Sequence, residues 1–284
     1  MTTAHRLRDI LDARGHATAI RTYADLAALA RWARTCDAEV THLACVGGDA
    51  TQSATAAAAV RLGIPFLPVP NGFGNIFARA FDHPGEAEGA AEVLEAGGLL
   101  YVDVGLVGDD EIFLAHHSYG PLQQIQDTVE RGRGQPKSRI ARYLAYWAMA
   151  KRMVIDARPP SLRVSVDGAL VADRATLVTV ANVETYRGFL SLTPDASPLD
   201  GVFDLFIVPR TSRRRLALLL VRLMLTSSTG RRDVIRCRGR RVDVTVNGRR
   251  REALRTVARA LPLLVPAGAA ERLAPAIAGA PKVT

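Results

Sequence analysis

The stretch THLACVGGDATQSATAAAAVRLGIP, residues Thr41–Pro65, joins an apolar run to an alanine-rich run through two glycines. THLACV predicts a strand, and the residues after the turn predict a helix over Ala50–Leu62. Between them, Gly47 and Gly48 allow main-chain N–H groups to approach a ligand closely. Because the helix adds the positive end of its dipole, the turn is typical of a phosphate-binding loop.

Two side chains of this turn suit bound phosphates, since Asp49 can orient a Mg²⁺ ion or its water shell and Thr51 offers a hydroxyl. A plain structural turn is the alternative for one such loop alone. A second loop, in VPNGFGNIFARAF, follows the next predicted strand and supplies Gly72, Gly74 and Asn75. The carboxyl ends of parallel strands share one edge of a sheet, so the pattern predicts that both loops meet at one crevice.

Helices are predicted over Thr3–Arg14, Ala24–Arg34 and Ala87–Ala96, and strands over HATAIRT and IPFLPV. Their alternation predicts a mainly parallel, Rossmann-like α/β domain over residues 1–100. Strand-like runs then follow one another with few helices, which predicts an antiparallel β-rich, sandwich-like domain over 101–259. The first two of these runs form a hairpin, and LPLLVP, within 260–284, is expected to pack back on the first domain. The strand-like runs are LLYVDVGLVG, EIFLAHH, LRVSV, ATLVTVAN, VFDLFIV and RVDVTV, and the helical inserts are SRIARYLAYWAMAKRM and SRRRLALLLVRLML.

Composition narrows the class of protein. Three distant cysteines, with no CxxC pair, favour neither a disulfide framework nor a zinc site, and with the lack of a secretory leader they favour the cytoplasm. The net charge of +9 is concentrated in late arginines, as in Arg213–Arg215 and Arg249–Arg251. This predicts either a solvated basic face or one that meets anionic lipid headgroups or nucleotide phosphates. Nucleic acid is disfavoured, because aromatic residues are only 6 % and none alternate with the arginines.

The motifs GGDAT and PNGFGNIFAR resemble the GGDGT loop and the following P-x-G-T-x-N-D-F-A-R segment of the diacylglycerol kinase catalytic-domain family. That family includes bacterial lipid kinases and sphingosine kinases and is distantly related to NAD kinases. The resemblance continues through YVDVGLVGDDEIFLAHHSYG, ANVETYRGFLSLTPDASPLDGVFDLFIV and RLALLLVRLML. It covers nearly the whole chain, and it implies a nucleotide held in the cleft between the two domains.

The resemblance also implies roles for particular residues. Asp49 and Asp103 would support catalysis and Mg²⁺, and Asp200 would bind a mainly structural Mg²⁺ with the carbonyls of Ser197 and Val202. The implied nucleotide-binding residues are Thr22, Gly47, Gly48, Asp49, Ala50, Thr51, Gln52, Ser53, Gly72, Phe73, Gly74 and Asn75.

Several positions depart from the family pattern. Family members begin with a strand and an N-P-x-x-G-like turn, whereas this chain begins with the expected next helix. Ala50 replaces a loop glycine, Phe73 replaces a nucleotide-contacting threonine, and Ile76 replaces an acidic residue. A missing central strand would leave unpaired backbone groups, and a homodimer is one way to supply it.

The largest departure is at the position of the general base. The family's aspartate-glycine-glutamate turn is Asn247-Gly248-Arg249 here. An amide is no general base at neutral pH, and an arginine carries the opposite charge. Glu252 is the nearest substitute, although a shift of three residues along a strand can place it on the wrong face.

The resemblance therefore implies an ATP- and Mg²⁺-dependent kinase that transfers the γ-phosphate to a lipid hydroxyl, such as that of diacylglycerol, at the inner face of the membrane. A pseudokinase-like protein that binds nucleotide or lipid without catalysis is the second hypothesis. A kinase of the NAD kinase type, with a soluble substrate, is the third.

Overall fold

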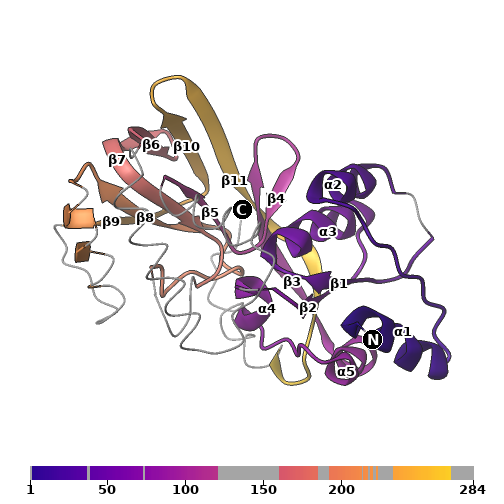
Figure 1. Ribbon diagram of the computed structural model, residues 1–284. Helices are drawn as coiled ribbons and strands as arrows, with labels where there is room; N and C mark the ends of the chain where they lie inside the picture. The colour runs from indigo at the N-terminus through magenta and orange to yellow at the C-terminus, as the bar shows by residue number, and fades with distance from the viewer. Residues whose placement is uncertain are drawn as a thin grey trace. The chain divides into compact units, whose positions relative to one another are not determined.

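The computed structural model describes residues 2–36, 39–72, 74–120, 160–184, 192–212, 214–216, 218–219, 222 and 233–269. The chain divides into two compact units (Figure 1). The N-terminal unit comprises Met1–Leu114, Pro198–Gly201 and Thr256–Thr284, and the β-rich unit comprises Ala115–Ser197 and Val202–Arg255.

The N-terminal unit contains the predicted helices and one short helix that was not predicted. The helices are α1 (Thr3–Ala13), α2 (Leu26–Thr35), α3 (Asp49–Leu62), α4 (Ile76–Ala80) and α5 (Ala87–Ala96). The strand predicted over HATAIRT is wrong, because this segment has no strand assignment. Its residues bind neighbouring helices instead: the backbone N–H of His16 donates to the carbonyl of Leu11, and the His16 ring lies 3.1 Å from Glu95 of α5.

The sheet of the N-terminal unit is built on two short parallel strands, β1 (Leu43–Gly47), which is partly exposed, and β2 (Phe66–Pro70), which is almost entirely buried. The long strand β11 (Arg250–Val265) joins it in parallel, with Leu263 opposite Phe66, so the LPLLVP segment forms its final part. β3 (Gly98–Val107) pairs with β11 and forms the predicted antiparallel hairpin with β4 (Glu111–Phe113). The mainly parallel α/β prediction is therefore confirmed.

Helices cover both faces of this sheet, which explains why β2 is apolar throughout. Leu7 and Leu11 of α1 pack with α5, with Leu67 and Val69 of β2, and with Leu264 of β11. A second cluster packs α2 against α3 through Ala33, Cys36 and Ala58, with Leu43 of β1 at its side.

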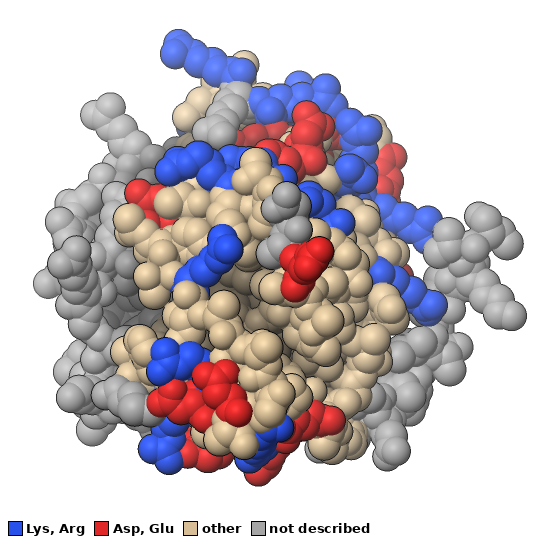
Figure 2. Space-filling model, turned by 90° about the vertical axis from the view of Figure 1, so that its right-hand side faces the viewer, with Lys and Arg blue, Asp and Glu red and all other residues tan. Residues whose placement is uncertain are grey.

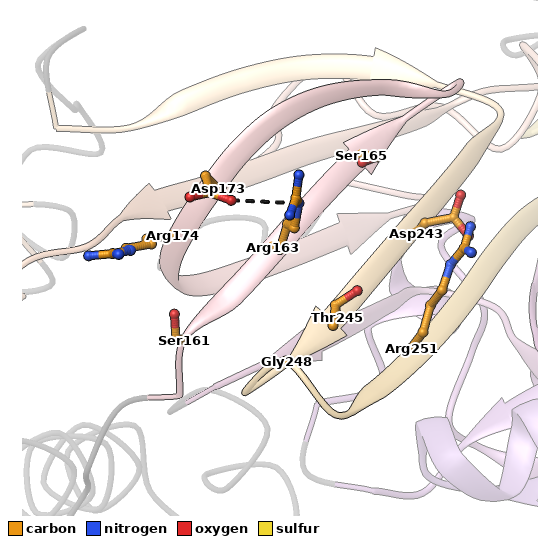
Figure 3. A pocket seen from close by; sticks show the side chains of 9 residues that line it. All are labelled: Ser161, Arg163, Ser165, Asp173, Arg174, Asp243, Thr245, Gly248 and Arg251. Atoms are coloured by element: carbon orange, nitrogen blue, oxygen red, sulfur yellow. Dashed lines mark hydrogen bonds and ion pairs between the residues drawn. The ribbon is translucent and has the colours of Figure 1, made fainter.

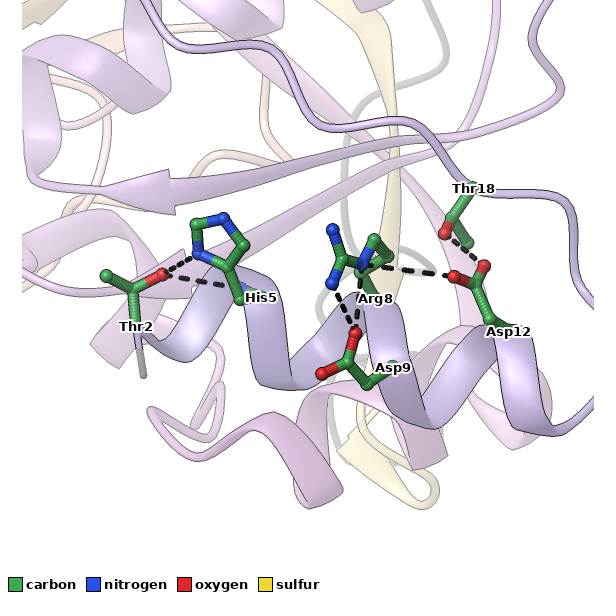
Figure 4. Close-up of polar contacts among 6 residues, drawn as sticks. All are labelled: Thr2, His5, Arg8, Asp9, Asp12 and Thr18. Carbon is green, nitrogen blue, oxygen red and sulfur yellow. Dashed lines mark hydrogen bonds and ion pairs between the residues drawn. The ribbon is translucent and has the colours of Figure 1, made fainter.

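The solvent face of α1 is held by local polar contacts (Figure 4). The Thr2 hydroxyl accepts a hydrogen bond from the backbone N–H of His5 and so caps the helix. Arg8 binds Asp9 at 2.6 Å and lies 3.9 Å from Asp12, which also accepts a bond from the Thr18 hydroxyl. These contacts hold the start of α1 and link its last turns to the segment that follows it.

The strands of the β-rich unit are all paired antiparallel, as predicted. They are β5 (His116–Tyr119), β6 (Leu162–Val166), β7 (Ala169–Ala181), β8 (Phe203–Pro209), β9 (Ile235–Gly239) and β10 (Arg241–Val246), together with the first residues of β11. β11, β10, β6, β7, β8 and β9 follow one another across the sheet, and β5 adds to β7. β9 was not predicted, because IRCRG alternates arginine with half-buried residues. The helix predicted over 138–153 lies outside the described residues. Of the second helical insert, residues 214–216, 218–219 and 222 are described as helix, and Ser212 is described without a helix assignment.

Candidate functional site

The two glycine loops of the N-terminal unit are in contact. The first follows β1 and the second follows β2, and the backbone N–H of Asn71 donates to the carbonyl of Gly47 at 3.0 Å. A Cβ atom added at Gly72 would lie 2.5 Å from the Cα of Gly48, so the two backbones touch where side chains are absent. The parallel register, with Gly47 opposite Pro70, produces this contact by ending both strands at one edge.

Asn75 closes the second loop on itself. Its Oδ1 accepts the N–H of Gly72 at 2.8 Å, and its Nδ2 donates to the carbonyl of Gly72 at 2.7 Å. The residue is buried at φ 50°, a left-handed conformation that asparagine tolerates better than most residues. Asn75 therefore shapes the loop, while Phe73 lies outside the described residues.

Asp49, the first residue of α3, joins the two loops. Its Oδ1 accepts the backbone N–H groups of Ile76 at 2.7 Å and Phe77 at 3.3 Å, at the start of α4. Burial raises the pKa of this carboxyl, while these backbone hydrogen bonds oppose the rise. A Cβ at Gly74 would lie 2.7 Å from Oδ2, so glycine leaves room beside the second oxygen. Oδ1 of Asp49 thus accepts hydrogen bonds that connect the two loops, whereas Oδ2 lies beside Gly74.

The start of α3 is suited to an anion. Gly48 is its N-cap, and no side chain provides a capping hydrogen bond there. The N–H groups of the first turn have no acceptor within the helix and carry the positive end of its dipole. Ala50 lies inside the helix and does not have positive φ, so its side chain causes no backbone strain. The methyl group of Thr51 packs against Gly47, where a Cβ would meet it at 2.9 Å.

Three other residues of the implied nucleotide site, Gln52, Ser53 and Thr22, differ in burial and in hydrogen bonding. Gln52 is fully buried, and its Nε2 donates to the carbonyl of Gly47 at 3.0 Å. This hydrogen bond attaches the first glycine loop to α3. The Ser53 hydroxyl accepts the N–H of Leu114 at 3.3 Å. Thr22 is exposed between α1 and α2. Gln52 and Ser53 therefore have hydrogen-bond partners within the N-terminal unit.

Asp103 of β3 is buried and anchors the segment that contains Asp200. Its carboxylate accepts the N–H of Gly201 at 2.6 Å and that of Arg259 at 2.8 Å, and its own N–H donates to Pro198 at 2.7 Å. Burial raises the pKa of Asp103, and the charge of Asp200 raises it further. The two implied acidic residues are therefore brought near each other.

The described residues contain no group of three or more His, Cys, Asp and Glu side chains that could hold a metal ion. The donor set implied for Mg²⁺ is of another kind, because it combines the Asp200 carboxylate with the carbonyls of Ser197 and Val202. Carboxylate and carbonyl oxygens suit a hard cation, and Asp200 has a second carboxylate near it. The chemistry of the donors therefore fits Mg²⁺.

In the β-rich unit, Asn247 and Gly248 form the turn of the β10–β11 hairpin. Both have positive φ, 52° and 69°, as a type I′ turn requires, and the N–H of Arg249 donates to Val246 at 3.1 Å. Asn247 also exchanges two hydrogen bonds with the backbone of Ser161, at 2.9 Å through its Oδ1 and 2.8 Å through its N–H. The side chain at the expected base position is therefore used to fix the start of β6.

Glu252 lies on the inner face of the same hairpin. It is opposite Val244, which is fully buried, and its Oε2 lies 4.0 Å from Nε2 of His117 on β5. The side chains of Glu252 and His117 are 17 % and 20 % exposed. The ring of Tyr119 stands edge-on to His117, with 5.0 Å between centroids. The sequence singled out Glu252 but gave no reason to pair it with His117, since the two are far apart in the chain.

Arginines of the β-rich unit are partly neutralised by ion pairs. Asp243 is within 3.4 Å of Arg241 and 3.0 Å of Arg251, and Arg238 lies 3.2 Å from Asp204. On the face shown in Figure 2, basic and acidic side chains also lie beside one another at the upper and lower edges. Within the described part of the chain, no helix is long and apolar enough to cross a membrane.

Two family models match the chain in succession. Residues 2–107 match the diacylglycerol kinase catalytic domain, and residues 126–260 match the YegS C-terminal NAD kinase beta sandwich-like domain. Together they match the two parts of the fold, an N-terminal α/β domain and a C-terminal β-sandwich-like domain. The chain belongs to the diacylglycerol kinase catalytic-domain family.

Curated relatives and solved structures agree with this assignment. A diacylglycerol kinase of Mycobacterium tuberculosis is 30% identical over 177 residues, which cover 60% of this chain and 55% of the relative. A diacylglycerol kinase of Staphylococcus aureus is 28% identical over 51% of this chain and 44% of its own length. The chain thus matches about half the length of these relatives.

Among solved structures, a diacylglycerol kinase of Bacillus anthracis is 18% identical, with a TM-score of 0.63 over 87% of this chain and 85% of that chain. A further structure from the same organism has a TM-score of 0.69 and 18% identity, over 93% of this chain and 91% of that chain. At this level of identity the likeness supports the fold.

Proposed function

We propose that the protein is a lipid kinase that transfers the γ-phosphate of ATP to the hydroxyl of diacylglycerol or a related lipid. The observation that carries the proposal is the contact of the two glycine loops at the uncapped start of α3. Side chains are absent where a phosphate must approach the backbone, and the helix dipole favours its negative charge. The kinase-family relatives support the same reaction class.

In this proposal, the nucleotide is held by residues of both loops. Gly47, Gly48 and the first turn of α3 bind its phosphates through backbone N–H groups, and Thr51 adds a hydroxyl. Asp49 keeps the loops together through Oδ1 and offers Oδ2 to Mg²⁺ or its water shell. A magnesium ion, when bound, neutralises phosphate charge. Asp200, assisted by Asp103, is the proposed holder of a structural ion.

The proton acceptor is the Glu252–His117 pair. When the lipid hydroxyl oxygen attacks the γ-phosphorus, the bond from that phosphorus to the β–γ bridging oxygen breaks, ADP leaves and the hydroxyl proton must be accepted. Asn247 cannot take it, because an amide is not basic and its Oδ1 already accepts the N–H of Ser161. A carboxylate beside an imidazole can take it, and its low exposure limits competition from water.

The lipid is proposed to be reached from the cytoplasm at the inner face of the membrane. Basic side chains of the β-rich unit, among them Arg236 and Arg240, would meet anionic headgroups there. Binding would be peripheral.

The test is Mg²⁺-dependent ATP binding by calorimetry, followed in the same sample by transfer of labelled γ-phosphate to an extracted lipid mixture. We expect both binding and transfer, with no transfer to NAD in a parallel reaction. Loss of ATP binding in Asp49→Ala, with an intact fold, supports the loop assignment. The absence of ATP binding in the wild type, or phosphorylation of NAD alone, overturns the proposal.

The second candidate is a pseudokinase-like nucleotide- or lipid-binding protein. It is favoured by the bonds between Asn247 and Ser161, which give the former base position a purely structural use. ATP binding without transfer to any lipid would support this candidate against the kinase.

A further inference from the structure

The outer face of the β-rich sheet carries a polar basin that the proposed kinase reaction does not use. It extends over β7, β6, β10 and β11 and has a volume of about 540 Å³ (Figure 3). Its charged and hydroxyl side chains include Arg163, Arg251, Asp173, Asp243, Ser161 and Thr245. These side chains alternate with buried ones such as Val244, so they belong to the solvent face.

The strand register sets two arginines on either side of one hydroxyl. Thr245 of β10 is opposite Arg163 of β6 and also opposite Arg251 of β11, in one row across three strands. Because neighbouring strands are about 4.8 Å apart, the two arginine backbones are roughly 10 Å apart. Two guanidinium groups can therefore converge on one anion above the threonine hydroxyl.

Asp173 and Asp243 only partly neutralise the arginines, so the net charge of the basin stays positive. Asp243 is 12 % exposed and is shared by Arg251 and Arg241. Asp173 lies 3.6 Å from Nε of Arg163, and both of these side chains are more than half exposed. Exposed pairs of this kind contribute little free energy, so a guanidinium can exchange its carboxylate for a ligand anion. Three arginines line the basin, Arg163, Arg174 and Arg251, against the two carboxylates of Asp173 and Asp243.

We propose that this basin binds a phosphate group, with Arg163 and Arg251 as the clamp and Thr245 as a central hydrogen-bond donor. Guanidinium groups pair with phosphate through two parallel N–H···O bonds, and the basin has room for a phosphate ester with a polar substituent. The phosphate comes from a phospholipid headgroup or from a free phosphate compound. The site is in the β-rich unit, and its ligand is independent of nucleotide binding at the glycine loops.

The test uses the full chain and two probes. Inorganic phosphate is titrated by calorimetry, and sedimentation is measured with vesicles of phosphatidylglycerol or of phosphatidylcholine. The variant Arg163→Gln/Arg251→Gln removes the clamp, and Arg8→Gln/Arg31→Gln makes the same charge change on α1 and α2. Circular dichroism checks that both variants fold.

We expect the clamp variant to bind the effective probe at least ten-fold more weakly, while the control variant and ATP binding stay unchanged. If the clamp variant loses only the binding of inorganic phosphate, the ligand of the basin is a free phosphate compound. If the clamp variant loses binding to phosphatidylglycerol vesicles, and the wild type binds phosphatidylcholine vesicles only weakly, the ligand of the basin is a phospholipid headgroup. Equal binding by the clamp and control variants overturns the site, as does the absence of binding to either probe. Failure of ATP binding at the glycine loops changes neither outcome.

Discussion

The glycine loops and the Asn247–Gly248 turn are both tight turns at positions where the family places chemistry, but they use their polar groups differently. In the loops, the N-cap of α3 has no side-chain hydrogen bond, and glycines leave the backbone accessible. In the hairpin, Asn247 is bonded to Ser161 through both its backbone and its side chain. The first turn leaves backbone N–H groups accessible, whereas the second uses the N–H of Asn247 as a donor and its Oδ1 as an acceptor to hold the sheet.

This difference indicates that the two halves of the proposed reaction are under separate structural control. In the proposed reaction, phosphate binding would depend mainly on backbone geometry, and Ala50 adds no strain to that geometry because its φ is not positive. Proton transfer depends on one side-chain chemistry, which an asparagine lacks. Glu252 is the carboxylate on the same hairpin, but it faces the interior with His117.

The largest expected effect is from Glu252→Gln, which keeps the size of the side chain and removes the carboxylate. Transfer of phosphate to lipid should fall by roughly 10²- to 10⁴-fold, the usual contribution of a general base. ATP binding should not change, because the glycine loops are in the other unit. Initial rates with labelled ATP and calorimetry give the two readouts.

Glu111→Gln, an exposed change on β4, is the matched control and should keep wild-type activity. If Glu252→Gln is as active as this control, the carboxylate at Glu252 is not the proton acceptor.

The next effect is expected when a carboxylate is returned to the turn. Asn247→Asp in the Glu252→Gln background should recover activity at least ten-fold. Aspartate tolerates positive φ and its oxygen can still accept the N–H of Ser161, so the hairpin should form normally. The measurement is the rate of lipid phosphorylation by the double variant relative to Glu252→Gln.

Asn247→Ala is the control in that background. It should lose about 2–3 kcal/mol of stability, because the side-chain hydrogen bond is lost and alanine is strained at φ 52°, and it should recover no activity. Equal rates for the Asp and Ala variants would show that this turn does not approach the reacting groups.

Two alanine substitutions should separate folding from phosphate binding in the loops. Gly72→Ala places a Cβ 2.5 Å from the Cα of Gly48 and should lower the free energy of unfolding by about 1–3 kcal/mol. At Gly48, φ is −86° and the nearest atom is at 3.4 Å, so alanine should fit the fold.

Gly48→Ala should nonetheless weaken ATP binding about ten-fold or more, because its methyl group covers the backbone where a phosphate approaches. Denaturant unfolding and calorimetry distinguish the two variants. A Gly48→Ala protein with wild-type ATP affinity would contradict the role of this loop.

The sequence predicted the parts of the fold that follow from hydrophobic periodicity. Apart from the short helix α4, the helices and the parallel strands around the glycine loops were found, because apolar spacing and glycines mark them locally. β9 and the beginning of β11 were missed, since exposed arginines interrupt the apolar pattern of both strands, Arg236 and Arg238 in β9 and Arg251 and Arg255 in β11. HATAIRT was mistaken for a strand, because its short apolar pattern gave no sign that it lacks a partner.

The candidate site could be predicted only where contacts are set by short sequence motifs. The two glycine loops were expected at one sheet edge, and the structure brings them into contact. The attachment of Asn247 to Ser161 and the approach of Glu252 to His117 depend on strand register between distant segments. A single sequence contains no signal for these pairings.

The smallest expected effect is on the pH dependence of stability. It is expected at His83, a buried histidine after the second glycine loop, and not at the exposed His42. His83 is buried, neither ring nitrogen has a hydrogen-bond partner among the described residues, and burial lowers its pKa from 6.5 to about 3. As the pH falls from 7 to 5, the unfolded imidazole binds a proton that the folded one does not. Stability should therefore fall by about 2 kcal/mol from this group. His83→Phe should remove that part of the pH dependence, whereas exposed His42→Phe should not. Urea unfolding at both pH values measures it, and identical pH slopes for His83→Phe and the wild type would show that the pKa of His83 is the same in the folded and the unfolded protein.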